Sequence, residues 1–390
     1  MKCNFDELID RRNSDSVKWS HFDEDVLPMW VADMDFPSAE PIVEALHKRV
    51  DHRVFGYPCD SVEVTEAIVN WLETRHNWKV SPDDLLLVPG VVSGFNLVGH
   101  AVTQPGDGVL LQTPAYPPFF GVSRNANLVQ QEAALVRNQD GTYEIDFDLF
   151  EQSIRDNTRV FMLCNPQNPT GRVFSRNELE KLAQICLRNN VIICSDEIHH
   201  DLVYSGSKHT PIASLSPEIS KNTVTLLAPS KTFNIAGLEA SVLVCTDPDL
   251  RKQIDQSRQG LLGWVNALAQ TAMLAAYRDC AGWLDEMLVY LEGNRDLVYE
   301  TVKNEMPGAV MGKPQGTYLA WIDFTGMGLG ESPYQFFLDR GRVGFNDGAR
   351  FGKEGEGFIR MNYGCPRSLL EDGLERMKKA LAHRTEAQLA

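Results

Sequence analysis

Two residues of opposite charge follow apolar runs that are typical of buried strands. Asp196 comes just after the run that ends at Cys194, and Lys231 comes just after the run that ends at Ala228. A carboxylate in such a place loses its hydration unless a positive group pairs with it. A lysine in such a place can have a depressed pKa, and its neutral amine can then form an imine with an aldehyde. The structural alternative is a buried ion pair between Asp196 and Lys231.

A glycine-containing turn follows another apolar run and precedes a predicted helix. The turn passes through Gly90, Val91 and Val92. Backbone N–H groups at the start of a helix are suited to binding a phosphate, so Val91 and Val92 are candidate phosphate contacts. Such turns also occur simply to reverse the chain, so this turn alone does not establish a site.

Two more turns carry groups that suit a planar, polar ligand. The proline-rich turn 113–118 can present the ring of Tyr116, for which a half-buried structural tyrosine is the alternative. The heptad 165–171, Asn-Pro-Gln-Asn-Pro-Thr-Gly, is rich in turn-forming residues and fixes an asparagine amide at a strand tip. A structural ion pair between Asp196 and Lys231 would not explain the phosphate turn, the tyrosine or the asparagine.

The elements that must position these groups alternate between strands and helices from about residue 85 to 245. This alternation predicts an α/β fold with a mostly parallel sheet sandwiched by helices. Ligands bind beyond the carboxyl ends of the strands in such sheets, where the unusual residues cluster. A capping box at Ser175 and Glu178 starts one of the predicted helices. The predicted strands are 85–88, 109–112, 160–164, 191–194, 224–228 and 241–245.

After about residue 285 the pattern changes to a long helix, two strands and a C-terminal helix. This change predicts a second, smaller α+β domain. We expect a large domain at 46–285, and a small domain made of 286–390 together with the N-terminal segment 1–45. The apolar stripe that includes Trp71, at helical spacing, is interpreted as core packing.

Composition narrows the possible partners. The 390 residues carry a formal net charge of -16, which would repel nucleic acid and anionic lipid, so neither is an expected partner. No apolar run reaches the length of a membrane helix or a signal peptide, so we expect a cytoplasmic protein. The eight cysteines show no metal-ligand spacing, so we expect reduced, mostly structural thiols and no metal.

Together these motifs resemble the fold-type I, aspartate-aminotransferase-like enzymes that use pyridoxal 5'-phosphate (PLP), and the resemblance covers nearly the whole chain. It implies that Lys231 binds PLP covalently and that Asp196 pairs with its pyridine nitrogen. It also implies that Asn168 bonds the ring hydroxyl, that Tyr116 stacks on the ring, and that Arg360, in Phe-Ile-Arg-Met-Asn-Tyr, holds the substrate α-carboxylate.

Within that family the chain is most similar to the cystathionine β-lyase, or cysteine-S-conjugate β-lyase, branch of the MalY/PatB type. The similar segments are Met-Trp-Val-Ala-Asp-Met-Asp-Phe at 29–36, Asp-Glu-Ile-His at 196–199, Ala-Pro-Ser-Lys-Thr-Phe-Asn-Ile-Ala-Gly-Leu at 228–238 and Asn-Tyr-Gly-Cys-Pro-Arg at 362–367. The resemblance adds Ala32 and Asn168 as substrate contacts. It further implies a homodimer in which Tyr57 reaches the phosphate of the neighbouring subunit's PLP.

Three positions depart from the wider aminotransferase pattern. His199 replaces a tyrosine beside the cofactor, Ala228 replaces a serine, and Glu239 replaces a phosphate-binding arginine. Binding of the PLP phosphate is therefore expected to depend on the Gly90 turn, Ser230 and the neighbour's Tyr57. Gln131, Glu239 and Arg350 have no assigned role.

The resemblance implies β-elimination on an L-cysteine thioether such as cystathionine, with release of a thiol, pyruvate and ammonia. Lys231 removes the α proton, and Tyr116 is a candidate for assisting proton movement beside its stacking role. One alternative is an aminotransferase, which would require a 2-oxo acid acceptor. Another is a regulatory protein that retains the fold. Side-chain specificity is expected to depend on the 345–348 loop and the N-terminal segment.

Overall fold

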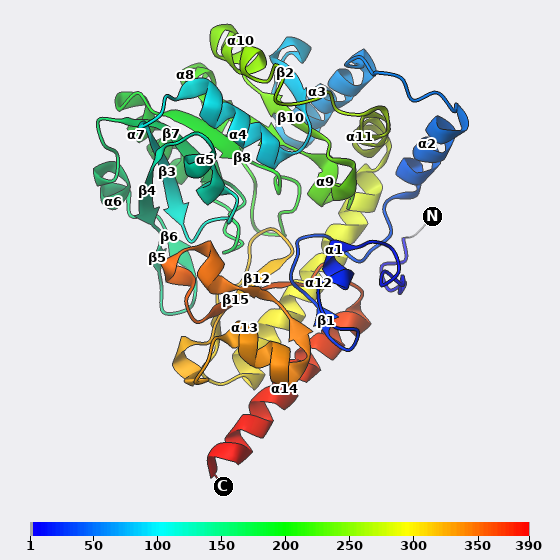
Figure 1. Cartoon of the computed structure of the whole chain (residues 1–390), viewed down its shortest axis with the longest axis vertical. Coiled ribbons are helices and arrows are strands. Elements are labelled where there is room, and N and C mark those ends of the chain that lie inside the picture. Colours follow the sequence, from blue (N-terminus) through cyan, green and yellow to red (C-terminus); the bar gives the residue numbers. More distant parts are fainter. Residues whose placement is uncertain (1–2, 390) are drawn as a thin grey trace.

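The structure is a computed structural model that describes residues 3–389. Figure 1 shows an upper and a lower part, with the long helix α12 (Ala281–Glu305) running from one into the other. The predicted domain boundary after residue 285 falls inside this continuous helix. The division into 46–285 and 1–45 with 286–390 stays a prediction.

The larger part contains a seven-stranded sheet in the order β2-β10-β9-β8-β7-β3-β4. Neighbouring strands from β9 to β4 are parallel, and only β10 runs antiparallel to its neighbours. The predicted α/β fold with a mostly parallel sheet is therefore confirmed. The strand bounds are β2 Leu85–Val88, β3 Gly108–Thr113, β4 Val129–Ala134, β7 Thr158–Cys164, β8 Ile192–Asp196, β9 Thr223–Leu227 and β10 Ser241–Val244.

Six of these strands were predicted from the sequence, with two informative differences. Strand β8 includes Asp196, which pairs in register with Cys164 of β7, so the carboxylate lies at the strand tip itself. The edge strand β4 was not predicted because its residues, Val-Gln-Gln-Glu-Ala-Ala, are half exposed and mostly lack strand-forming side chains.

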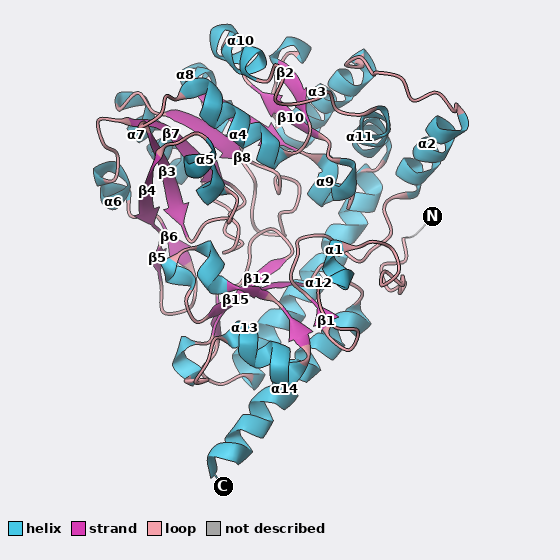
Figure 2. Cartoon of the chain, viewed as in Figure 1, coloured by secondary structure: helices cyan, strands magenta, loops and turns pink. Residues whose placement is uncertain are grey.

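Helices cover both faces of the sheet (Figure 2). Alternate residues of β3 show this, since Val109 and Leu111 pack in one buried cluster and Leu110 packs in another. Helices α4 (Val91–Val102), α5 (Phe119–Asn125) and α10 (Pro248–Ser257) cover the first face. Contributing to the other face are α6 (Phe147–Gln152), α7 (Arg176–Arg188), α3 (Val62–His76) and α11 (Ala267–Asp279).

Two predictions about helices are confirmed. Ser175 and Glu178 form a capping box at the start of α7, with both reciprocal hydrogen bonds present. Trp71 is buried in the largest core cluster, where it packs against Phe233 and Tyr277. The stripe on α3 is therefore core packing.

The smaller part contains a four-stranded antiparallel sheet in the order β11-β12-β15-β14. Its strands are β11 Val310–Met311, β12 Leu319–Asp323, β14 Asn346–Asp347 and β15 Phe358–Asn362. The helices beside it are α12, α13 (Pro333–Phe336) and α14 (Arg367–Leu389). The two strands predicted after residue 285 correspond to β12 and β15.

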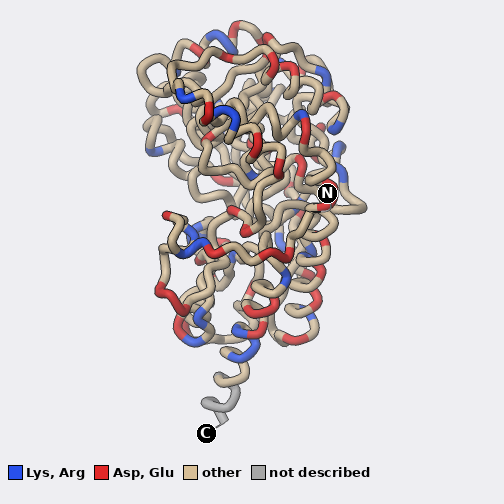
Figure 3. Tube along the Cα trace, turned by 90° about the vertical axis from the view of Figure 1, so that its right-hand side faces the viewer, with Lys and Arg blue, Asp and Glu red and all other residues tan. Residues whose placement is uncertain are grey.

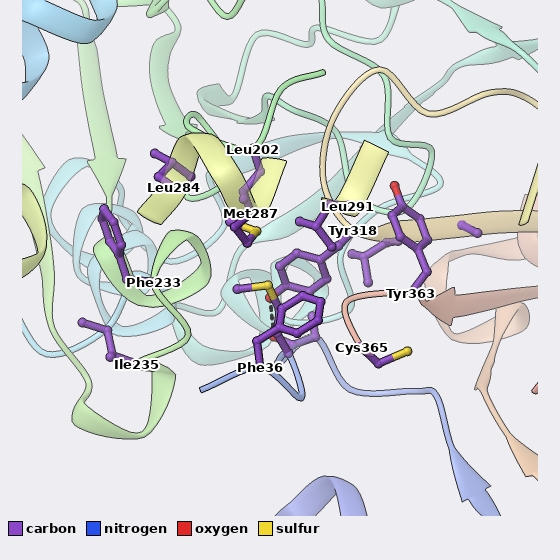
Figure 4. Packing of buried hydrophobic residues seen from close by; sticks show 14 of the residues in the cluster. Phe36, Leu202, Phe233, Ile235, Leu284, Met287, Leu291, Tyr318, Tyr363 and Cys365 are labelled. Carbon is purple, nitrogen blue, oxygen red and sulfur yellow. Dashed lines mark hydrogen bonds between the residues drawn. The ribbon is translucent and has the colours of Figure 1, made fainter. Parts of the chain in front are cut away.

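The N-terminal segment packs beside the smaller part. Strand β1 (Leu27–Pro28) pairs in parallel with β13 (Val343–Gly344). Helices α1 (Val17–Ser20) and α2 (Glu40–Asp51) flank it in sequence. Figure 4 shows Phe36 with Met287 and Tyr318, three members of the cluster that joins this segment to α12 and to the start of β12.

The surface carries both signs of charge. Figure 3 shows acidic and basic positions interspersed along the trace of both parts. Within residues 3–389, no helix combines the length and the apolar character needed to span a membrane. The cytoplasmic location and the lack of nucleic-acid and membrane partners stay predictions.

Candidate active site

A cavity of about 230 Å³ lies at the carboxyl ends of the central strands. It brings together most of the candidate residues, although they come from positions up to two hundred residues apart. Arg360 donates a hydrogen bond to Asn168, which lines the cavity. The side chain of Tyr57 is 91% exposed and does not line it. The predicted residues that line it are Ala32, Val91, Val92, Tyr116, Asn168, Asp196, His199, Ser230 and Lys231.

Lys231 lies on α9 (Pro229–Thr232), a single turn that follows β9 and begins with a proline. Its Nζ donates a hydrogen bond to the carbonyl oxygen of Ala32 at 2.6 Å. Burial, together with the positive charge of Arg360, lowers the Lys231 pKa to about 8, although Asp33 and Asp196 oppose this shift. The amine is therefore much more often neutral near pH 7 than an exposed lysine, as attack on an aldehyde requires.

Asp196 is buried at the tip of β8, where the backbone N–H of Ile198 donates to its Oδ1 at 3.0 Å. The Asp196 pKa is raised to about 7, chiefly by burial and slightly by the neighbouring Glu197, although the Ile198 N–H and Lys231 oppose this shift. This carboxylate has no direct cationic partner among residues 3–389. The site can therefore stabilise a positive group of a ligand beside Asp196.

The opposite end of the cavity suits an anion. Gly90 precedes α4 with φ +85°, a left-handed conformation that favours glycine, and no side chain caps the helix. The first N–H groups of α4, at Val91 and Val92, have no partner within the helix and can bind a phosphate. In the described chain no lysine or arginine other than Lys231 lines this cavity, and Glu239 is one of its lining residues.

Arg360 is held by three acceptors before any substrate arrives. Its Nη1 donates to Asn168 Oδ1 at 2.9 Å, and its Nη2 donates to Asn346 Oδ1 at 2.6 Å and to the Trp30 carbonyl at 3.3 Å. The guanidinium also lies over the ring of Phe351, 4.9 Å from its centroid. Burial lowers the Arg360 pKa to about 10, so the group stays cationic at neutral pH and can bind a carboxylate.

Tyr116 and His199 complete the cavity wall. Burial raises the pKa of Tyr116, so its hydroxyl is protonated at neutral pH. Burial holds the His199 pKa well below its usual range, so the ring is neutral. Among the described residues His199 Nδ1 finds no hydrogen-bond partner, although it is buried, which leaves that atom available to a ligand.

Ala32 lines the cavity and belongs to the segment 30–33, which we call the strap because other side chains hold its backbone carbonyls. Asn362 Nδ2 donates to the carbonyls of Val31 and Asp33 at 2.7 and 2.6 Å, and the Tyr318 hydroxyl donates to the Ala32 carbonyl at 3.0 Å. Behind the strap, Asp35 is buried and accepts from Lys18 at 2.6 Å. These contacts fix the carbonyl that Lys231 touches.

Several of these contacts were not predicted from the sequence. Asn346, Tyr318 and Asn362 hold the arginine or the strap, yet each reaches its partner only through tertiary pairing of distant strands. The only signal for Asn346 was its place in the 345–348 loop, which the sequence assigns to specificity. Cys164 also lines the cavity, although the sequence indicated only a structural thiol.

A buried polar cluster lies directly behind α9. Asp201 accepts from Trp71 Nε1 at 3.1 Å and from Thr232 Oγ1, next to Lys231, at 3.1 Å, and its Oδ1 lies 2.8 Å from His76 Nε2. Possible metal-ligand atoms of His76, His200 and Asp201 lie within 4.8 Å of one another. The expectation of no metal stays a prediction. The hydrogen bonds connect α3 to the helix that carries Lys231.

Comparisons with known proteins agree with this geometry. A family model described as aminotransferase class I and II matches residues 24–377. Cystathionine beta-lyase PatB of Bacillus subtilis (strain 168) is 43% identical over 388 residues, which cover 97% of this chain and 100% of the relative.

Solved structures also resemble this chain over nearly its whole length. Cystalysin from Treponema denticola, which contains a pyridoxal 5'-phosphate cofactor, superimposes with a TM-score of 0.94 at 33% identity and covers 98% of this chain and 100% of its own. The PLP-bound C-S lyase from Staphylococcus hominis gives a TM-score of 0.91 at 34% identity, covering 97% and 99%. The predicted MalY/PatB-type resemblance is confirmed, and the chain belongs to the aminotransferase class I and II family.

Proposed function

We propose that this protein is a PLP-dependent carbon–sulfur β-lyase that cleaves L-cystathionine or related L-cysteine S-conjugates. The observation that carries the proposal is a single cavity in which a lysine of lowered pKa, a buried carboxylate and a helix N-terminus converge beside Arg360. The proteins with the names cystathionine beta-lyase and C-S lyase support the choice of reaction.

The residues of the cavity fit PLP. Asp196 would face the pyridine nitrogen, which gains a proton beside a carboxylate, and the N–H groups of Val91 and Val92 would face the phosphate together with Ser230. The unpaired His199 Nδ1 and the Asn168 amide are polar groups available to the rest of the ring. Bound PLP supplies an electron sink for the α carbon.

The residues of the chain then have distinct tasks. Arg360 binds the substrate α-carboxylate while Asn168 and Asn346 hold its guanidinium in position. Lys231 Nζ removes the α proton, because its lowered pKa makes it a base near neutral pH. Asp196 keeps the proton on the pyridine nitrogen. The thiolate leaves from the β carbon, and water completes the conversion of the remaining fragment to pyruvate and ammonia.

An aminotransferase is the second candidate, since the family model takes its name from that activity. Both reactions begin with the same proton removal at the α carbon, and they differ in whether the β substituent then leaves. A lyase needs no second substrate beyond water, whereas an aminotransferase stops after one turnover unless a 2-oxo acid is supplied.

The test combines spectroscopy with product analysis. Purified protein supplied with PLP is expected to gain visible absorbance that is lost in Lys231→Ala, and to release thiol and pyruvate from L-cystathionine without an oxo acid. Turnover only after an oxo acid is added would favour the aminotransferase. Failure of the wild-type protein to bind PLP would refute both.

We further propose a homodimer in which Tyr57 completes the neighbour's phosphate site. Tyr57 is 91% exposed and contacts Trp264 edge-on, with 5.6 Å between ring centroids. Val54, Phe55 and Leu261 are other large apolar side chains exposed in the same two segments, 50–62 and 261–264. A second copy seated there would bury them. It would also supply a hydroxyl to a phosphate site that has few side-chain donors of its own.

A further inference from the structure

A second cavity, of about 180 Å³, is lined by two residues that also contact Arg360. Asn346 lines it and also accepts from Arg360 Nη2 at 2.6 Å. Trp30 lines it as well, and the Trp30 carbonyl accepts from the same Nη2 at 3.3 Å. The second cavity is therefore adjacent to the proposed α-carboxylate site.

Much of the wall of this cavity is aromatic, and it comes from the N-terminal segment and from the smaller part. His21 packs against Trp30 with 4.4 Å between ring centroids and a tilt of 32° between the rings, and both belong to the N-terminal segment. Phe345 and Tyr334 come from the smaller part. The N-terminal segment and the 345–348 loop, which contains Phe345, are the two that the sequence assigns to side-chain specificity.

Two opposite charges stand in the same cavity. Arg350 is exposed, lines the cavity, and has no hydrogen bond or ion pair to any of residues 3–389. Its charge acts on Arg360, so the two guanidinium groups lie near each other. Asp347 lines the cavity too, and its Oδ1 accepts only the N–H of Ala349 at 3.2 Å, which leaves its Oδ2 available.

We propose that this cavity binds the distal end of a dipolar thioether, with Arg350 holding a second carboxylate and Asp347 holding a second ammonium group. The inference rests on the proposed lyase function and specifies its substrate class. A substrate whose α-carboxylate is on Arg360 would extend its sulfur substituent past that guanidinium. Cystathionine carries an amino-acid group at that far end, whereas a simple S-alkyl cysteine carries none.

The repulsion between Arg350 and Arg360 strengthens the case. Two nearby guanidinium groups repel each other, and each gains from a carboxylate of its own. A substrate with two carboxylates satisfies both. The same two arginines would disfavour a substrate with a cationic distal end that lacks a carboxylate.

The experiment compares kcat/KM for L-cystathionine with kcat/KM for S-methyl-L-cysteine in the full PLP-loaded protein. In Arg350→Ala and in Asp347→Asn, the ratio of the two values is expected to fall about tenfold or more, because only cystathionine loses a charged contact. Arg350→Lys keeps the charge and should recover part of the ratio. Arg340→Ala is the matched control, since Arg340 is a half-exposed arginine paired with Glu331 at 2.9 Å and outside the cavity.

The outcomes separate this inference from the proposed function. An unchanged ratio, or an equal loss for both substrates, would overturn the distal site and leave the lyase function standing. If the wild-type protein releases pyruvate from neither substrate, the lyase function fails and the inference falls with it. Because two variants at different residues are compared, failure of one to fold does not decide the test.

Discussion

At the scale of single residues, the environment of Lys231 determines its pKa and therefore its reactivity. Burial and Arg360 push its pKa down to about 8, while Asp33 and Asp196 push it up. Only the neutral amine attacks an aldehyde, so the rate at which the cofactor-free protein binds PLP covalently should follow the deprotonation of this lysine.

We expect the rate of covalent PLP attachment to rise with pH through an apparent pKa of about 8, rather than near that of a free lysine. Asp33→Asn removes a negative charge that favours the ammonium form, so it should lower the Lys231 pKa and speed attachment at pH 7 roughly two- to fivefold. Stopped-flow absorbance measures this rate. Asp372→Asn, on the exposed face of α14, is the control, and a slower rate in Asp33→Asn would contradict the assignment.

Asn346 allows a second test at this scale. Its Oδ1 holds Arg360 Nη2 at 2.6 Å, so Asn346→Ala leaves the arginine less well oriented for a carboxylate. We expect KM for L-cystathionine and for S-methyl-L-cysteine to rise together, by about tenfold, with a smaller change in kcat. Steady-state kinetics decide this, with exposed Asn304→Ala as the control. A rise for cystathionine alone would show that Asn346 acts through the distal cavity that it lines, and not through the orientation of Arg360.

At the scale of elements, local sequence patterns predicted the strands that carry the chemistry. Asp196 and Lys231 each lie where a buried strand ends, and hydrophobic runs indicate such places without knowledge of the fold. Periodicity could not predict β4, because this edge strand places a buried glutamine, Gln131, among exposed residues and has no apolar signature. Nor could it assign Gln131, whose Oε1 accepts from Thr158 Oγ1 at 2.5 Å in a purely structural contact.

The contacts of Arg360 show that local sequence patterns cannot predict contacts between distant segments. Its role came from the resemblance of its motif to a family, whereas its partners Asn168, Asn346 and Trp30 come from three separate segments. Register in the antiparallel sheet brings Asn346 opposite Arg360, and register depends on long-range pairing. Arg350 and Glu239, without a role at the level of sequence, both line cavities in the structure.

The cluster behind α9 should stabilise the protein in a pH-dependent way. Burial alone would raise the Asp201 pKa, but His200, His76 and Arg75 outweigh it and hold that pKa well below its usual range. The charged carboxylate accepts hydrogen bonds from Trp71 and from Thr232. In Asp201→Asn, the amide NH₂ group would face groups that also donate, so one of these hydrogen bonds would be lost. We expect a loss of about 1–3 kcal/mol in the free energy of unfolding at pH 7.

The sign of the pH effect follows from the lowered pKa. The contribution of Asp201 is present above the pKa of an unfolded aspartate, about 3.9, and is lost as pH falls towards the lower folded pKa. The difference between wild type and Asp201→Asn should therefore shrink in acid. Urea unfolding at several pH values measures it, with Asp285→Asn as an exposed control that also pairs with Arg75. A pH-independent difference would argue that Asp201 is not charged in the folded state.

At the scale of the whole molecule, the exposed apolar side chains around Tyr57 indicate an interface. Phe55→Asp introduces a charge there and should convert the dimer to a monomer and weaken PLP binding, since the neighbour's Tyr57 is withdrawn. Light scattering and PLP titration measure both effects. Val289→Asp is the control, because Val289 is 73% exposed on α12 and lies outside the two segments. A wild-type monomer with full PLP affinity would contradict the shared site.

The central claim is that this protein breaks the carbon–sulfur bond and does not merely exchange amino groups. The most direct measurement is the yield of thiol, pyruvate and ammonia from excess L-cystathionine, with PLP-loaded protein freed of all oxo acids. The account predicts equal amounts of the three products over many turnovers. A single turnover per active site, restored only by adding a 2-oxo acid, would contradict it.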